Sequence, residues 1–530
     1  MRRVTSRFFS GLGWLALALT LFGCGGGGSG GDSCCKVSLY DSSLNLLERI
    51  SANKGQLIDL SVYSVKYGGA DWYKGGQTAP LSTSVRYWVD GDVNLYAASD
   101  VIEISDELGL RDLNNSCGTT KLYIMLKDIA LADRWIPFCE DSQRFIGTLN
   151  GNEYNITDLW VDDEGQPVGL FRAIGSGGAV KNLGVKTADG KEINGTWGSI
   201  GGIVGFHYGT IENVRFDGNV SGAGNYIGGI AGASASGSVI KGASFEGNVS
   251  GAGNYTGGIV GYSSGGITSS RFDGNVSGGE GSYIGGIAGR LSGADINNSY
   301  SKGYVGGESN VGGVVGYIDN AKVNAVYSSA IVNGVNNAGG VAGVIYFSGS
   351  AISEINNSYS VGNVIAEGNF TGGIVGSAES SGSAGEVKIA NNYSEGNISG
   401  DNSVSGIVGG IKTYRASVHN NAAINEKITA NNDVNSAVGH KGPNNLLVQN
   451  NFALSTMSLP AGLGADGAAG VAKTSSALQT ESVYSASIVG DGLGGLGWSF
   501  GNDDDHPWRW GAFGGYLYPT LYWQEEAPKR

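Results

Sequence analysis

The sequence predicts an all-β protein whose central part is a parallel β-helix, wound right-handed with three short strands in each coil. Two observations predict this fold. GNVSGAGNYIGGIAG at 218–232 returns almost unchanged as GNVSGAGNYTGGIVG at 247–261, and related segments recur every 26 to 34 residues. A period of this length is typical of stacked repeats. Nothing in the repeats has helical spacing, and they are too short to form the four-stranded blades of a propeller.

Each repeat begins with a glycine-rich apolar pentapeptide and continues into a segment that alternates in polarity. The pentapeptides are GGIVG at 201–205, GGIAG at 228–232, GGIVG at 257–261, GGIAG at 285–289, GGVVG at 312–316, GGVAG at 339–343 and GGIVG at 372–376. Strand periodicity in the alternating segment directs Val214 and Phe216 inward and Arg215 and Asp217 outward. Roughly ten or eleven coils at the strand spacing would make a rod of about 50 Å.

The repeats are aligned on the apolar residue that follows Gly-x. This alignment gives Val220, Val249, Val276, Val305, Ile331, Val364 and Ile398. Glycine is expected to recur because tight corners need positive φ and because a thin coil leaves little room for side chains.

Asparagine doublets also recur along the repeats, and their second members are Asn298, Asn357, Asn392, Asn421 and Asn451. Asparagine tolerates the left-handed backbone conformation, and its amide can stack on the next coil. These five residues are therefore assigned to turns and stacking. A role in contacting a ligand is the alternative, and we favour the structural role.

Composition excludes several classes of protein. The chain has 94 glycines, 8 prolines, 41% hydrophobic residues and 15% charged residues, which suits short strands and tight turns rather than disorder. Its formal net charge is −14, whereas nucleic-acid binding needs clustered Lys and Arg. Nucleic acid is therefore not an expected partner.

The N-terminus has the features of an export signal. Arg2, Arg3 and Arg7 precede an apolar stretch that is too short to span a membrane. The stretch ends in Leu21-Phe22-Gly23-Cys24, which resembles a bacterial lipobox, and the resemblance implies that the Cys24 thiol is lipidated. A plain secretory signal is the alternative. The glycines after Cys24 read as a flexible tether, and Gly25 favours the outer membrane if the cell is Gram-negative.

The other cysteines are read in this oxidising context. Cys117 and Cys139 are a disulfide candidate. Cys34 and Cys35 are adjacent, so a vicinal bridge and bridges to other cysteines are both open. No cysteine has zinc-ligand spacing.

Six regions are expected along the chain. Residues 98–116 have roughly helical spacing, with Ser105 and Asp106 available to cap the helix, and the aromatic-rich C-terminus is expected to cover the last coil. Residues 36–92 fit either a small β module or extra capping strands. The regions are a signal peptide (1–24), a tether (25–35), a β-rich region (36–92), a helical cap with the first coil (93–140), the β-helix (141–470) and a helix with an aromatic cap (471–530).

The units GGIVGYSSGGITSSRFDGNVSG and VGGVVGYIDNAKVNAVYSSAIVNG resemble the GLUG motif of bacterial surface proteins. That motif occurs in non-catalytic parts of IgA-type metallopeptidases and in adhesins similar to filamentous haemagglutinin. The resemblance spans about residues 118–460 and implies a scaffold. The chain has no His-Glu-x-x-His, so the metallopeptidase activity of some relatives does not carry over.

Carboxylates that point outward from adjacent coils are weak catalytic candidates. Asp217, Glu246 and Asp273 are expected about one strand spacing apart, a separation at which acid pairs hydrolyse glycosides. Arg215 and Arg271 share their face, so an ordinary solvated ion-pair surface is the favoured interpretation. No catalytic residue, metal site or cofactor is assigned.

These observations predict a surface lipoprotein, anchored through Cys24, whose β-helical faces bind an extended partner in the manner of an adhesin. The expected partners are the membrane, through the lipid, and a polysaccharide or a cell-surface protein. The alternative is a β-helical polysaccharide lyase or glycoside hydrolase. Ice binding is set aside because Thr is sparse at equivalent positions.

Overall fold

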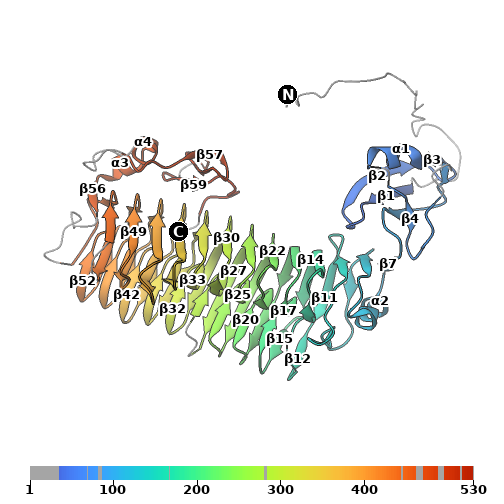
Figure 1. Ribbon diagram of the computed structural model, residues 1–530, viewed down its shortest axis with the longest axis horizontal. Coiled ribbons are helices and arrows are strands. Elements are labelled where there is room, and N and C mark those ends of the chain that lie inside the picture. Colours follow the sequence, from blue (N-terminus) through green and yellow to red (C-terminus); the bar gives the residue numbers. More distant parts are fainter. Residues whose placement is uncertain are drawn as a thin grey trace, which may run out of the picture.

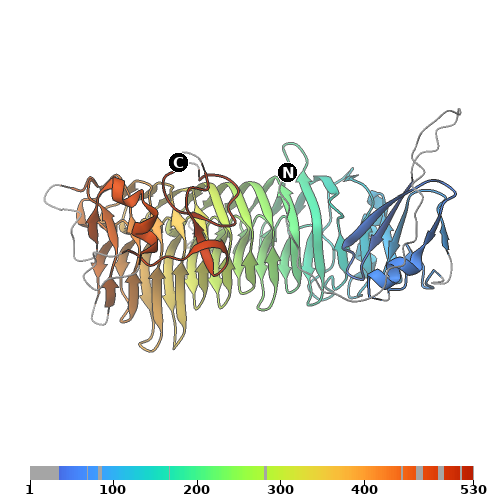
Figure 2. The ribbon, with the colours of Figure 1, turned by 90° about the horizontal axis from the view of Figure 1, so that it is seen from above.

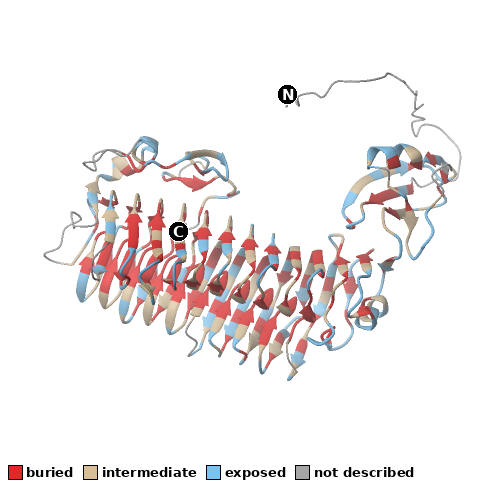
Figure 3. Cartoon of the chain, in the orientation of Figure 1, coloured by how far each residue is buried: buried red, intermediate tan, exposed pale blue. Residues whose placement is uncertain are grey.

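A computed structural model describes residues 35–528 except 69, 82–85, 166, 280–282, 443–445, 461–469, 487–494 and 514–515. Most of these residues form a rod whose successive coils build three parallel sheets (Figure 1). The predicted parallel β-helix is therefore confirmed. Buried residues recur along the whole length of the rod, as Figure 3 shows, and their apolar side chains belong to one continuous hydrophobic core.

Two of the sheets are built from short strands, one from each coil in each sheet. The nine-stranded sheet contains β16 (Ser199–Gly201), β20 (Tyr226–Gly228), β24 (Tyr255–Gly257), β28 (Tyr283–Gly285), β32 (Ser309–Gly312), β37 (Asn336–Gly339), β42 (Asn369–Gly372), β47 (Asn402–Ser405) and β52 (Asn432–Asn435). The ten-stranded sheet contains β13 (Phe171–Ile174), β17 (Val204–His207), β21 (Ala231–Ser234), β25 (Val260–Ser263), β29 (Ala288–Ser292), β33 (Val315–Asp319), β38 (Ala342–Phe347), β43 (Val375–Ser380), β48 (Val408–Ile411) and β53 (Val438–Lys441).

The third sheet, here called the large sheet, holds the alternating segments. Its strands include β14 (Ala179–Thr187), β18 (Thr210–Asp217), β19 (Asn219–Gly222), β22 (Val239–Lys241), β23 (Ser244–Gly251), β26 (Gly266–Thr268), β27 (Arg271–Gly278), β30 (Asp295–Asn297), β31 (Tyr300–Gly306), β35 (Tyr327–Ser328), β36 (Ile331–Gly334), β40 (Tyr359–Ser360), β45 (Tyr393–Ser394), β50 (Ala422–Ala423) and β55 (Phe452–Leu454).

Equivalent residues of successive coils face each other in the large sheet. Phe216, Phe245 and Phe272 stack inside the rod with ring centroids 5.7 and 5.9 Å apart. The predicted alignment is wrong at one position, because the partner of Val305 is Val332 while Ile331 is 45% exposed. Ala330 and Ile331 are both apolar, so the alternation of apolar and polar residues is offset by one position there. The residue that points inward decides the register.

The pentapeptide glycines are required by close backbone contact. A methyl group added at Gly232, Gly261 or Gly316 would lie 2.4 Å from a backbone nitrogen of the preceding coil's strand in the nine-stranded sheet. Positive φ, the other predicted reason for glycine, occurs instead at the corner of the large sheet, for example at Gly247 (φ 143°) and Gly303 (φ 99°).

The N-terminal end holds a small module and a cap. The module has a four-stranded sheet, a two-stranded sheet, one helix and its own core; its elements are β1 (Cys35–Tyr40), β2 (Leu46–Ala52), β3 (Leu57–Asp59), α1 (Leu60–Lys66), β4 (Tyr73–Lys74), β5 (Arg86–Trp88) and β6 (Val93–Tyr96). The expected helix over 98–116 is shorter than predicted. Its first part is strand β7 (Val101–Ile104), paired with β8 (Leu122–Met125), and α2 (Glu107–Arg111) begins after Asp106, which caps it.

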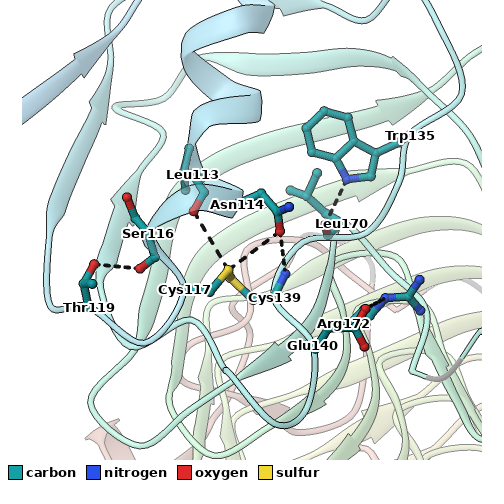
Figure 4. Close-up of a disulfide and its surroundings, with 10 residues drawn as sticks. All are labelled: Leu113, Asn114, Ser116, Cys117, Thr119, Trp135, Cys139, Glu140, Leu170 and Arg172. Carbon is teal, nitrogen blue, oxygen red and sulfur yellow. Dashed lines mark hydrogen bonds and ion pairs between the residues drawn. A yellow bond between two sulfur atoms is a disulfide. The ribbon is translucent and has the colours of Figure 1, made fainter.

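A disulfide fastens this cap to the rod. Cys117 and Cys139 form the pair that the sequence analysis expected, with Cα atoms 5.3 Å apart (Figure 4). Beside it, the Asn114 side chain accepts a hydrogen bond from the Cys139 backbone, and Trp135 donates its indole N–H to the Leu170 carbonyl. The cap therefore covers the first coils through a covalent link and a buried indole.

The C-terminal segment lies elsewhere than predicted. After the last coil come β56 (Val471–Lys473), α3 (Ser475–Leu478) and α4 (Glu481–Ser485), and the chain then reverses and runs back along the side of the rod (Figures 1 and 2). Residues 495–528, here called the strap, include β57 (Phe500–Asp503), β58 (His506–Arg509) and β59 (Thr520–Leu521). The expectation of an aromatic cap over the last coil is wrong, since the aromatic side chains cover a lateral face.

Replacing Gly261 with alanine should destabilise the rod by about 1–3 kcal/mol, the usual cost of overpacking, because the new methyl group would overlap the backbone of Ile227. Gly266→Ala is the matched control, since a methyl group there has nothing within 4 Å. Urea unfolding of both variants measures the difference. Equal midpoints for the two variants would contradict this explanation of the repeated glycine.

Candidate functional site

One outward column of the large sheet changes its chemistry halfway along the rod. Its members, in register from coil to coil, are Arg215, Ser244, Arg271, Tyr300, Tyr327, Tyr359, Tyr393, Ala422 and Phe452. The neighbouring inward column changes at the same coil, from Phe272 to Ser301. The aromatic ring thus moves from inside the rod to outside, and the dipeptide Arg-Phe in the sequence becomes Tyr-Ser.

The outward tyrosines are covered by the strap. Their rings stack on one another at 4.8, 5.2 and 4.7 Å from Tyr300 to Tyr393. Tyr327, Tyr359 and Tyr393 are at most 1% exposed, although they point away from the interior of the coil. Burial raises the pKa of Tyr359 and of Tyr393 well above the usual value, so both hydroxyl groups remain protonated donors.

The strap contacts this column with rings and hydrogen bonds. Trp523 stacks near Tyr300 and Tyr327, with centroids 6.1 and 5.8 Å away, and Trp508 lies 5.9 Å from Tyr393. Each aromatic pair contributes about 0.5–1.5 kcal/mol beyond area burial.

Four hydrogen bonds add to these stacks. Tyr359 donates to Gln524 at 2.6 Å, Tyr393 donates to the Pro519 carbonyl at 2.8 Å, and the indoles of Trp498 and Trp523 donate to the carbonyls of Asn420 and Ala325. The strap is therefore packed and hydrogen-bonded against the rod and forms part of its surface.

The strap lies in a bend of the large sheet. The bend continues toward the N-terminal coils, past the last described residues of the strap. The bend follows residues with positive φ, among them Asn213, Ser269, Asn298, Asn357 and Asn420. Two residues of this column form hydrogen bonds with the strap. The Asn298 side chain donates to Asp504, and the Asn420 carbonyl accepts from the indole of Trp498. Toward the N-terminus no described residue of the strap covers the bend, and its floor becomes polar.

Two adjoining hollows mark this open part, here called the groove. The first, of about 620 Å³, lies against the end of the strap and is lined by Ser269, Ser270, Arg271, Asn298, Tyr300, Tyr327 and residues 522–526. The second, of about 260 Å³, is lined by Asn213, Val214, Arg215, Gly242, Ala243, Ser244, Ser269 and Arg271. Ser269 and Arg271 belong to both, so the groove is continuous along the rod.

The predicted acidic residues border the groove. Asp217, Glu246 and Asp273 occupy one column in successive strands, as expected, with Lys186 before them and Lys302 after them. Arg215 lies 3.5 Å from the carboxylate of Asp217 and 3.7 Å from that of Glu246. The Asp217 and Glu246 side chains are 40% and 46% exposed, so both lie on a solvent-accessible face of the rod.

The five predicted asparagines belong to two different columns. Asn298 and Asn357 have positive φ (50° and 49°) and lie at the bend, whereas Asn392, Asn421 and Asn451 occupy the next position and are buried. In the first group a serine separates the doublet from the outward column, as in Asn-Asn-Ser-Tyr ending at Tyr300. In the second group the second Asn of the doublet takes the place of that serine, as in Asn-Asn-Tyr ending at Tyr393.

The buried asparagines form a ladder of amides inside the rod. Asn392 donates to the Asn421 side-chain oxygen at 3.0 Å, and Asn421 donates to that of Asn451 at 2.9 Å. Asn421 also donates to the carbonyls of Ile389 and His419. These three amides are buried and join successive coils by hydrogen bonds.

Two further polar side chains are held by the fold. His207 is fully buried, and burial lowers its pKa to about 4, so it is neutral near pH 7. Asp504 in the acidic turn accepts hydrogen bonds from Asn298 and Tyr522 and so fixes the strap. Within the described ranges, no three His, Cys, Asp or Glu side chains are arranged to hold a metal ion.

Cys24 and Cys34 fall outside the described residues, so lipidation and the pairing of Cys34 stay predictions. Cys35 is buried at the start of β1. Among the described helices, none has the length and apolar character needed to cross a bilayer.

Comparison with known proteins finds short similarities. No family model matches the chain. It is 37% identical over 84 residues to a protein named "Putative Gly-rich membrane protein" from Evansella cellulosilytica, and 38% identical over 99 residues to "Halomucin" from Haloquadratum walsbyi. These matches cover 16% and 18% of this chain but only 10% and 1% of those proteins.

A solved structure also resembles the chain. It is described as a "putative immunoglobulin A1 protease from Bacteroides ovatus" and is 18% identical, with a TM-score of 0.29. The similarity covers 80% of this chain and 93% of that one.

Replacing Asn421 with alanine should destabilise the protein by about 1–3 kcal/mol, because the buried amides and carbonyls that it joins would lose their partners. Asn432→Ala removes a similar but exposed amide pair with Asn402 and should change stability by no more than about 0.5 kcal/mol. Thermal unfolding monitored by circular dichroism compares them. A ladder variant as stable as the surface variant would count against the inward assignment.

Proposed function

We propose that this protein is a β-helical scaffold displayed at the cell surface, and that it binds an extended partner in the groove of the large sheet. The half-filled bend is the observation that supports this proposal. The strap lies along the bend over the tyrosine column, so the bend accommodates an extended chain with aromatic and polar groups. Beside residues 522–526 the same bend has two adjoining hollows with polar lining residues, which suit a second chain.

The floor of the groove favours a polysaccharide over a protein strand. The floor is made of side chains from strands inside the sheet, such as β27, which pairs with β23 on one side and β31 on the other. A peptide that adds to a sheet needs a free strand edge, and this surface offers none. Hydroxyl, guanidinium and carboxylate groups beside aromatic rings are the chemistry that a sugar chain needs.

Surface display rests on the N-terminal sequence and on the names of the relatives. The basic residues, the apolar stretch and Cys24 support a lipid anchor, and assignment to the GLUG-containing surface proteins rests on the quoted repeats. The relatives named as a membrane protein and as a halomucin are compatible with a location at the cell envelope.

A polysaccharide lyase or glycoside hydrolase is the second candidate, favoured by one observation. Asp217, Glu246 and Asp273 do lie in adjacent strands beside the groove. The exposure of these side chains, and the ion pairs of Asp217 and Glu246 with Arg215, support a binding surface instead.

Residues 35–530, immobilised on a sensor, should retain soluble polysaccharides from a panel of bacterial, plant and algal polymers without cleaving them. Reducing-end and unsaturated-product assays on the same mixtures measure turnover, and the variant Glu246→Gln reports on the acidic column. Cleavage that Glu246→Gln abolishes would establish the enzyme instead. If neither polymers nor whole bacterial or host cells are retained, the scaffold proposal fails.

A further inference from the structure

We propose that the larger hollow of the groove, at the end of the strap, binds the terminal sugar of a glycan chain when that sugar carries a carboxylate. Arg271 would pair with the carboxylate, and the rings of Tyr522 and Trp523 would contact the sugar ring. This inference rests on the proposed function and names the ligand of the same groove.

Arg271 is the cation that the groove leaves open. It is exposed in β27, and its Nε donates to the Ser244 hydroxyl at 2.9 Å. Among the described residues no carboxylate forms an ion pair with it, whereas Arg215 in the same column lies within 3.7 Å of two. A guanidinium whose Nε is fixed in this way keeps its terminal N–H groups for a carboxylate, which it binds with two parallel hydrogen bonds.

The wall opposite is aromatic and fixed. Trp523 is stacked on Tyr300 and Tyr327 and is still partly exposed to the hollow. The hydroxyl of Tyr522 is bonded to Asp504, which also holds Asn298. Rings that are already held lose little conformational freedom when they bind a ligand.

The lining of the hollow also includes a polar side chain, Asn298. The side-chain oxygen of Asn298 is buried and has no hydrogen-bond partner, although the residue lines the hollow. The amide nitrogen of Asn298 donates to Asp504, so this residue is a fixed polar part of the lining. The hollow of about 620 Å³ is within the size range of small-ligand sites.

The surrounding charges restrict the ligand to one carboxylate at a time. Asp273 and Glu525 lie at or beside the hollow, as does Glu526, which is paired with Lys302, and Asp217 and Glu246 continue the acidic column. A polyuronate or a nucleic acid would bring further negative charges against these residues. Neutral hydroxyl groups would instead donate to them, which favours a neutral chain with an acidic end.

The test uses residues 35–530 on an array of oligosaccharides that end in glucuronic, galacturonic or sialic acid, each beside a matched chain with a neutral end. An acidic peptide of equal length is printed as well. Titration calorimetry then measures the best acidic oligosaccharide. We expect Arg271→Gln to weaken its binding at least tenfold, Arg271→Lys to weaken it less, and Arg215→Gln to change it less than twofold, with unchanged melting temperatures.

Equal binding of acidic and neutral ends, or binding that survives in Arg271→Gln, would overturn the inference while leaving the scaffold proposal intact. Preference for the acidic peptide would overturn it in favour of a protein partner. Failure to bind any acidic-ended oligosaccharide would also overturn it, and the polymer and cell-retention experiment would then decide separately whether the scaffold proposal survives.

Discussion

The rod depends on the close approach of backbone to backbone between successive coils. The glycines of each pentapeptide, such as Gly232 and Gly261, leave room for a neighbouring strand where a methyl group would be 2.4 Å from a backbone nitrogen. This contact fixes the axial position of every coil on the one before it. Once the coils are in register, like residues stack on like residues, so the phenylalanine stack, the amide ladder and the tyrosine column all follow from it.

Because equivalent residues of successive coils stack in register, a small change in the repeat sequence alters the surface along several coils. The exchange of Arg-Phe for Tyr-Ser in the four coils from Tyr300 to Tyr393 moves one ring per coil to the outside and puts a small serine inside. The outside of those coils is then apolar and needs a cover, which the strap supplies. The described residues of the strap cover the bend over the tyrosine column, and the hollow beside Arg271 adjoins residues 522–526.

The sequence predicted the solenoid, its repeat, the inward Phe column, the adjacent acidic residues and the Cys117–Cys139 pair, because each of these depends on local periodicity or on a simple count. It did not predict the strap. The chain's aromatic end could cover any apolar face, and only the register shows which tyrosines point outward. The swap from Arg-Phe to Tyr-Ser was a readable signal of a covered outer face. The shift of the Asn doublets and the misaligned Ile331 have the same cause, since a one-residue offset between coils is invisible without the pairing.

Cross-linking between coils tests the central claim, in-register stacking, most directly. Ser221 and Ser250 are partners in adjacent strands, and Ser277 is the partner of Ser250 one coil further on. Adjacent strands lie about 4.8 Å apart, within the range of Cα distances that a disulfide spans. The account predicts that Ser221→Cys with Ser250→Cys forms a disulfide under mild oxidation, found by mass spectrometry of the digested protein, and that Ser221→Cys with Ser277→Cys does not. Equal cross-linking of the two pairs, or of neither, would contradict it.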